Sequence, residues 1–153
     1  MQEPFSFQMA QHVKGIYHPG MMKWHYEHGL VIMACLEADP SLFSWAYGLY
    51  DGSIVTYREG EFNLDQINPG RNLFTLYRKT GEQRFLDAAR LLRSQLEHQP
   101  RTKSGIFWHK GIYPWQVWLD GQYMEGPFYA QYSQLTDDRK GMEDVVRQLK
   151  TTY

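Results

Sequence analysis

The chain has 153 residues, of which 42% are hydrophobic and 22% charged, a composition typical of one globular domain. Its 16 basic and 17 acidic residues give a formal net charge of -1, which offers no long-range attraction for nucleic acid or for an anionic membrane surface. No apolar run reaches the roughly 18 residues that a membrane helix needs, and the N-terminus lacks the basic-then-apolar order of a secretory signal. We therefore expect a cytoplasmic protein with no nucleic-acid or membrane partner.

The first predicted helix covers residues 22–37 and ends at Asp39-Pro40, because proline cannot continue a helix. Ser41 can cap a second helix that runs to about residue 50. Cys35 is the only cysteine, so no disulfide can form within the chain. Because it lies within an apolar run, we interpret it as a packing residue of the core.

The next two predicted helices cover residues 65–79 and 82–98, with Thr80-Gly81 as the break between them. The second has the clearest apolar stripe of the chain, at positions i, i+3, i+4, i+7 and i+11. The stripe consists of Phe85, Ala88, Ala89, Leu92 and Leu96. Together these helices predict a helical hairpin.

A final pair of helices is predicted over residues 119–135 and around residues 142–149, separated by Thr136-Asp137-Asp138. No window shows a strong strand alternation. The sequence therefore predicts an all-α fold of three helical hairpins, spaced about 40 to 55 residues apart. The long connection over residues 99–118 is too rich in aromatic residues for a disordered linker, which favours a functional loop.

Aromatic residues make up 16% of the chain, and many of them lie beside glycine or proline in segments that resemble loops. Flat rings such as Trp108 and Trp115 suit the faces of sugars, which present C–H groups to the ring and hydroxyls to its polar neighbours. Ordinary core or interface packing is the alternative, and the composition alone favours it.

Asp65 and Asp120 are the candidate functional carboxylates. Each lies near the start of a predicted helix, where an N-cap role is the simpler interpretation. Asp120 is flanked by aromatic residues, however, and desolvation by such rings is expected to favour its protonated form, as a general acid requires. Paired carboxylates are the usual equipment for chemistry at a sugar ring.

His109 lies in the long loop and could donate a hydrogen bond to a substrate oxygen, although a surface or packing role is the alternative. His25 and His28 have no third ligand at metal spacing, so we expect no zinc site. Phosphate-binding loops, serine nucleophile elbows and paired cysteine motifs are not found in the sequence. We expect neither a metal nor a cofactor.

Four short blocks of the sequence resemble one known family. They are, in chain order, Trp24 with Tyr26 and Gly29, then Asp65-x-Ile67-Asn68-x-Gly70, then Phe107-Trp108-His109 with Tyr113-Pro114, and Trp118-Leu119-Asp120-Gly121-x-Tyr123-Met124-x-x-Pro127-Phe128. They are similar to the unsaturated rhamnogalacturonyl hydrolases of glycoside hydrolase family 105, relatives of the unsaturated glucuronyl hydrolases of family 88. The resemblance covers nearly the whole chain.

The resemblance implies an (α/α)6 barrel of six helical hairpins, of which residues 1–153 would form one incomplete domain with three hairpins. It also implies hydration of the 4,5-double bond of the unsaturated uronic acid that polysaccharide lyases leave at a chain end. The residue matching Asp120 protonates C4 and takes a proton from the water that adds at C5. The resulting hemiketal opens and releases the neighbouring sugar.

The resemblance further implies that Asp65 and His109 orient the uronic acid and that Tyr26 lines the pocket, while stacking by the two loop tryptophans is inferred from their type and position. The predicted substrate-binding residues are Asp65, His109, Tyr26, Trp108, Trp115, Tyr123 and Met124. The expected partner is an oligosaccharide from pectin or a glycosaminoglycan that ends in an unsaturated uronic acid.

The chain departs from the family in length, because family members are more than twice as long. A downstream histidine and a Trp-x-Arg-Gly-x-Gly-Trp block, which help to hold the substrate in the family, have no counterpart here. A half barrel leaves the apolar faces of inner helices uncovered, so a homo-oligomer could cover them. The alternative to an active hydrolase is a catalytically inactive half domain with a sugar-binding or structural role.

Overall fold

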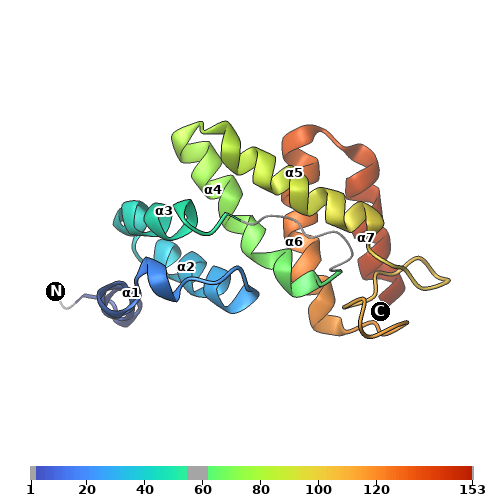
Figure 1. Cartoon of the computed structure of the whole chain (residues 1–153), viewed down its shortest axis with the longest axis horizontal. Coiled ribbons are helices and arrows are strands. Elements are labelled where there is room, and N and C mark those ends of the chain that lie inside the picture. The colour runs from blue at the N-terminus through green and yellow to red at the C-terminus, as the bar shows by residue number, and fades with distance from the viewer. Residues whose placement is uncertain (1–2, 55–61, 153) are drawn as a thin grey trace.

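The structure is a computed structural model and describes residues 3–54 and 62–152. In these two segments the chain forms seven α-helices and no β-strand, which confirms the all-α prediction (Figure 1). The helices are α1 (Phe5–Ile16), α2 (Tyr26–Ala38), α3 (Phe43–Asp51), α4 (Arg71–Thr80), α5 (Gln83–His98), α6 (Leu119–Thr136) and α7 (Arg139–Thr152). No helix within the described segments is both long and apolar enough to span a membrane.

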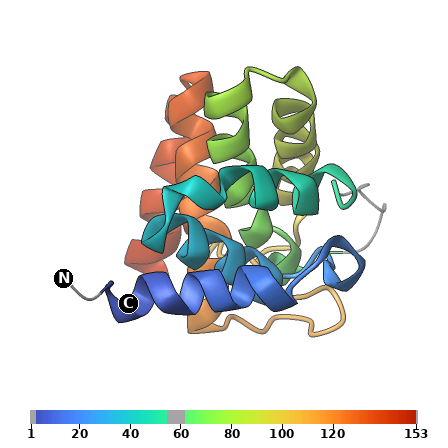
Figure 2. The same ribbon diagram turned by 90° about the vertical axis from the view of Figure 1, so that its left-hand side faces the viewer.

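The helices form an inner row and an outer row. Helices α2, α4 and α6 contact one another in chain order, and each also contacts the helix that follows it, α3, α5 or α7. The three predicted hairpins are therefore confirmed. Helix α1 packs against α2; it lies with α3 at the left in Figure 1, and both lie in front of α2 in Figure 2. We therefore assign α1 to the outer row.

Helix α1 was not among the elements predicted from the sequence. Its apolar residues recur at roughly helical spacing, but several of them remain exposed, among them Phe5 and Met9. Its buried residue Ala10 joins Cys35 and Leu42 in a small cluster between α1, α2 and the turn before α3. Cys35 is buried, as predicted, and burial raises the pKa of its thiol.

The starts of α2 and α3 differ from the prediction. Helix α2 begins at Tyr26 and not at residue 22, after a 3-10 turn at Pro19–Met21. The cap after α2 is Asp39 and not Ser41: the Asp39 carboxylate accepts the backbone N–H of Ser41 at 2.9 Å. Pro40 opens this 3-10 turn because the first helical position needs no N–H donor.

Residues 64–70 form two 3-10 turns, Leu64–Gln66 and Asn68–Gly70, and α4 starts only at Arg71. The residue before a proline is disfavoured in the helical region, and Pro69 has no N–H to donate, so a regular helix cannot start at residue 65. Gly81 ends α4 as predicted, with a φ of 72°, and its N–H donates to the Tyr77 carbonyl.

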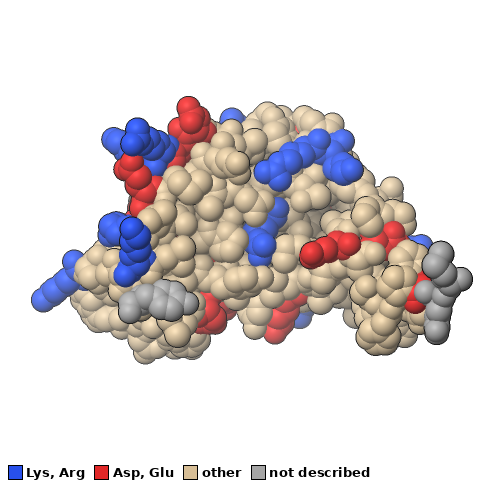
Figure 3. All heavy atoms as spheres, turned by 180° about the vertical axis from the view of Figure 1, so that it is seen from behind, with Lys and Arg blue, Asp and Glu red and all other residues tan. Residues whose placement is uncertain are grey.

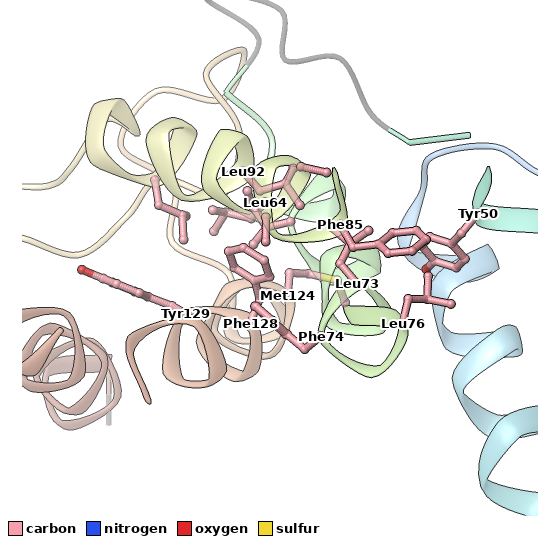
Figure 4. Packing of buried hydrophobic residues seen from close by; sticks show 14 of the residues in the cluster. Tyr50, Leu64, Leu73, Phe74, Leu76, Phe85, Leu92, Met124, Phe128 and Tyr129 are labelled. Atoms are coloured by element: carbon pink, nitrogen blue, oxygen red, sulfur yellow. The ribbon is translucent and has the colours of Figure 1, made fainter. Parts of the chain in front are cut away.

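The core lies between the inner and outer rows (Figure 4). Phe74 of α4 and Phe128 of α6 pack with ring centroids 5.3 Å apart, and both are almost fully buried. Inner helices approach one another closely where glycine removes the side chain. A Cβ added at Gly29 of α2 would lie 2.7 Å from the Pro69 Cα, so this contact requires glycine.

Candidate functional site

The N-terminal ends of the inner helices meet at one end of the half barrel. The turns before α4 contact both α2 and α6. The Trp24 indole N–H, just before α2, donates to the Gln66 carbonyl at 2.8 Å. The loop over residues 99–118 joins the same end, where the Leu64 N–H donates to the His109 carbonyl at 3.1 Å. Blocks that lie far apart in the sequence are thereby brought together.

Asp65 is the buried anion of this site, with 5% of its surface exposed. Its Oδ2 lies 2.7 Å from the Lys110 Nζ, and its Oδ1 lies 3.4 Å from the His109 Nε2. The His25 Nε2 lies 4.0 Å from Oδ2. A buried carboxylate requires such partners because an unpaired buried charge is costly. Asp65 therefore serves as the centre of a network and not as a simple helix cap.

His109 is buried, with 1% exposed, which rules out the surface role considered from the sequence. Its ring stacks on Trp118 at 4.3 Å and 12°, and its backbone N–H donates to the Gln116 carbonyl at 2.9 Å. Burial lowers the pKa of His109, and the nearby carboxylates of Asp65 and Asp120 offset part of that effect. The ring therefore favours its neutral form, in which one nitrogen donates and the other accepts a hydrogen bond.

Gly121, the residue after Asp120 at the start of α6, has little room for a side chain. A Cβ added at Gly121 would lie 3.0 Å from the His109 Nδ1 and 3.4 Å from the Leu64 Cδ1. Glycine at this position therefore lets the His109 ring pack directly against the first turn of α6. This contact keeps the imidazole beside Asp120, the preceding residue.

Asp120 lies in the first turn of α6, two residues after the N-cap residue Trp118, where a carboxylate interacts favourably with the helix dipole. Its residue surface is exposed. The expectation that aromatic rings shelter Asp120 is therefore wrong for the part of the chain that the structure describes. Of the neighbouring aromatic residues, Trp118 is 39% exposed and Tyr123 is 46% exposed. Asp120 still lies close to His109, because a Cβ added at the next residue, Gly121, would lie 3.0 Å from the His109 Nδ1.

The loop contributes two groups of rings. Tyr113 stacks on Trp118 at 5.5 Å and 16°, which extends the row of parallel rings from the buried His109 to the surface. Trp115 packs instead on Trp108, at 4.9 Å and 56°, and is 62% exposed. Trp115 has a φ of 66°, a conformation that costs energy for a residue with a Cβ. Trp108 and Trp115 thus form a second aromatic group in the loop, paired with each other and not with His109.

The remaining predicted site residues lie in different surroundings. Tyr26 starts α2, is half-buried, and has its ring 4.6 Å from that of His25. The Tyr123 hydroxyl accepts a hydrogen bond from the Arg71 Nη1 at 3.2 Å, with the guanidinium over its ring. Met124 is 5% exposed and belongs to the hydrophobic core. In this structure it therefore packs on the core side of α6.

Three contributors to the network around Asp65 were not predicted as site residues. Lys110 adjoins His109 in the sequence, and this position beside a candidate residue was the available signal. Trp118 lies two residues before Asp120 in the matching block. His25 carries no local signal, because only the packing of α2 against the turns before α4 brings it to Asp65. Within residues 3–54 and 62–152 no group of three or more His, Cys, Asp or Glu residues could hold a metal ion.

Comparisons with known proteins identify the family of the chain. The family model of Glycosyl Hydrolase Family 88 matches residues 5–153. A solved structure of a glycoside hydrolase of family 105 from C. acetobutylicum ATCC 824 is similar over 99% of this chain, with 34% sequence identity and a TM-score of 0.84. The match covers 45% of that protein, so this chain spans less than half of its length. The seven helices thus correspond to part of an (α/α)6 barrel, and the chain belongs to glycosyl hydrolase family 88.

Proposed function

We propose that this chain carries the proton-transfer site of a hydrolase that hydrates the 4,5-double bond of a terminal unsaturated uronic acid. The oligosaccharides that carry this group derive from pectin or from a glycosaminoglycan. The one observation that carries the proposal is the meeting of Asp65, His109 and Asp120 at one end of the inner helices. These residues are separated by up to 55 positions in the sequence. Packing of the helices alone would not require acidic and imidazole side chains to meet at this end of the inner helices.

Asp120 is the group best placed to exchange protons with a substrate, because it is exposed beside a buried, neutral imidazole. In the proposed reaction its carboxylic acid gives a proton to C4 of the double bond. The resulting carboxylate then takes a proton from the water whose oxygen bonds to C5. The hemiketal that forms opens to a ketone and releases the neighbouring sugar.

Asp65 and His109 orient the sugar in this proposal. Lys110 and His109 already hold the Asp65 carboxylate, so its position is set before a substrate binds. The stacked rings of Trp118 and Tyr113 offer flat faces for the sugar, and Tyr26 lines the same end. We propose that residues 1–153 form an incomplete barrel domain and that its open side is covered by another chain or segment.

The test follows the absorbance of an unsaturated disaccharide at about 235 nm, where its conjugated uronate absorbs. The wild-type chain is mixed with the disaccharide, and Asp120→Asn serves as the inactive variant. We expect loss of absorbance with the wild type and a rate at least ~100-fold lower with the variant, the usual contribution of a general acid–base residue. Because Asp120 is exposed, the variant is expected to unfold at the same urea concentration as the wild type.

A second function is an inactive half domain that binds sugar without reacting. The exposure of Asp120 favours it. This function predicts that neither the wild type nor Asp120→Asn changes the absorbance of the disaccharide, while the disaccharide quenches the tryptophan fluorescence of both. That result would contradict the hydrolase.

A further inference from the structure

The C-terminal end of α5 carries two buried glutamines that bind the backbone of distant segments. The Gln95 Nε2 donates to the Asn63 carbonyl at 3.1 Å, and the Gln99 Nε2 donates to the Trp108 carbonyl at 2.8 Å. Gln95 is 2% exposed and Gln99 is 3% exposed. They lie four positions apart, so both amides can extend from the same face of the helix end. One short stretch of α5 thus contacts two segments that lie far apart in the sequence.

The two bound carbonyls belong to residues that lead directly into the site. Asn63 caps the turn that contains Asp65, and its side chain accepts the backbone N–H of Asp65 at 3.0 Å. Trp108 is the residue before His109. The amides of α5 therefore hold the start of the turn that bears Asp65 and the residue next to His109.

The same two segments also bind each other, but through a short pairing. The Leu64 N–H donates to the His109 carbonyl at 3.1 Å, and the Gly111 N–H donates to the Phe62 carbonyl at 2.7 Å. Isolated pairings of two extended segments are marginally stable in water. The α5 amides lie outside this pairing and fix each segment to the same helix, which stabilises the relative position of the two segments.

The His109 ring depends on this backbone for its position. Its Nε2 lies 3.4 Å from the Asp65 Oδ1, and its Nδ1 is buried with no hydrogen-bond partner among the residues that the structure describes. The separation of imidazole and carboxylate is therefore set by where the two segments lie. Charged side chains are spread over the surface, as one face of the molecule shows (Figure 3), whereas the two glutamine amides are buried and neutral. A neutral amide binds a carbonyl without placing a further charge near the buried carboxylate.

We propose that Gln95 and Gln99 are positioning residues that keep Asp65 beside His109. They act through the backbone of residues 63 and 108. The inference rests on the proposed function for its catalytic consequence, because the same pair is proposed to orient the sugar; the contact itself is a property of the folded chain. The competing explanation is that both amides only satisfy buried carbonyls, as buried polar groups require. That explanation predicts a lower overall stability with no specific effect on the pair.

The test replaces each glutamine by methionine, singly and together, since methionine has a similar length and no N–H group to donate. The matched control is Asn72→Leu in α4. The buried Asn72 Nδ2 donates to the Gly29 carbonyl at 2.8 Å and to the Tyr50 hydroxyl at 2.7 Å. The control thus also removes a buried amide from a backbone carbonyl, but from one that belongs to neither paired segment. Urea midpoints measure the loss of overall stability in every variant.

Amide hydrogen exchange measured by NMR reports on the pairing itself. The Leu64 and Gly111 amides exchange when the two segments separate, which does not require the helices to unfold. We expect the combined Gln95→Met and Gln99→Met variant to raise both exchange rates at least ~10-fold relative to amides in the middle of α6. Each single variant should raise them at least ~3-fold, so the test does not depend on the combined variant alone. In Asn72→Leu the relative rates should stay within about twofold of the parent.

The electrostatic coupling between Asp65 and His109 provides the second measurement. The His109 imidazole is titrated by NMR. The charged groups that act on it are Asp65, Asp120 and Lys110. Because the Asp65 carboxylate favours the imidazolium, Asp65→Asn should lower the pKa of His109 in the parent chain. We expect this shift to be reduced by at least about half in the combined glutamine variant and to be unchanged in Asn72→Leu.

Two results would overturn the inference. One is a combined variant with the exchange rates and the coupling of the parent. The other is an Asn72→Leu variant that changes both as much as the combined variant does, because the effect would then be a general loosening of the fold. Neither measurement needs turnover. Asp120→Asn, which removes catalysis in the proposed function, should leave the exchange rates unchanged, so a failure of the proposed function is distinguishable from a failure of this inference.

Discussion

Glu125 of α6 is the most unusual ionisable group in the described part of the molecule. It is 0% exposed, and neither carboxyl oxygen has a hydrogen-bond partner there. Burial, followed by the negative charge of Asp144 on α7, raises its pKa to about 8, and Arg101 of the long loop only partly opposes this. Arg101 is already engaged, with its Nη2 2.6 Å from the Asp144 Oδ2. Glu125 is therefore protonated at neutral pH in the folded chain.

The consequence is a loss of stability as pH rises. The unfolded chain releases the Glu125 proton near the ordinary glutamate pKa of 4.5, whereas the folded chain keeps it up to about pH 8. The contribution of Glu125 to stability is thus highest below pH 4.5 and falls between these two values, since the folded state binds more protons. At about 1.36 kcal/mol per pH unit, the total loss over this window is about 5 kcal/mol. The pKa of His109, lowered by burial, opposes this trend below pH 6.5.

Glu125→Gln removes the titrating group while keeping its shape. The free energy of unfolding is measured by urea titration with tryptophan fluorescence at pH 5, 6, 7 and 8, for the wild type and the variant. We expect the two proteins to agree within about 1 kcal/mol at pH 5, where both side chains are neutral in the folded state. At pH 8 the variant should be more stable by about 4 to 5 kcal/mol. Glu97→Gln, at an exposed site of α5, should follow the wild type throughout.

Parallel curves for the wild type and Glu125→Gln from pH 5 to pH 8 would refute the reasoning. They would mean that Glu125 either ionises normally or finds a partner in solution. A variant that is less stable than the wild type at every pH would also contradict it, because the neutral carboxyl would then be making a contact that glutamine cannot replace.

Two further predictions concern the site and the inner helices. Lys110→Met removes the closest cationic partner of the buried Asp65 and should lower the free energy of unfolding by about 2 to 3 kcal/mol. Lys103→Met changes an exposed residue of the same loop and should have little effect. Equal urea midpoints for the two variants would contradict the pairing of Lys110 with Asp65. Gly29→Ala should cost about 2 to 3 kcal/mol because its Cβ would meet backbone atoms at 2.7 Å. Gly48→Ala, with open space in the interior of α3, should instead stabilise by about 0.5 to 1 kcal/mol, and thermal unfolding of both variants tests the contrast.

The sequence by itself determined the helical class, the three hairpins and the identity of the chemical groups. Apolar stripes such as that of α5 depend on neighbours three and four positions away, so a local pattern suffices to predict them. The break at Gly81 and the burial of Cys35 could be predicted for the same reason. The matching block around Asp120 also lies within one continuous segment.

Only the tertiary structure decided how the site is assembled and how its groups are charged. The partners of Asp65 come from the cap before α2 and from the long loop, 40 and 45 positions away, so their contacts depend on how helices pack and not on local spacing. Burial likewise belongs to the whole fold: Glu125 lies inside while Asp120, five residues earlier on the same helix, lies outside. Both are acidic residues of α6, and their surroundings alone separate them.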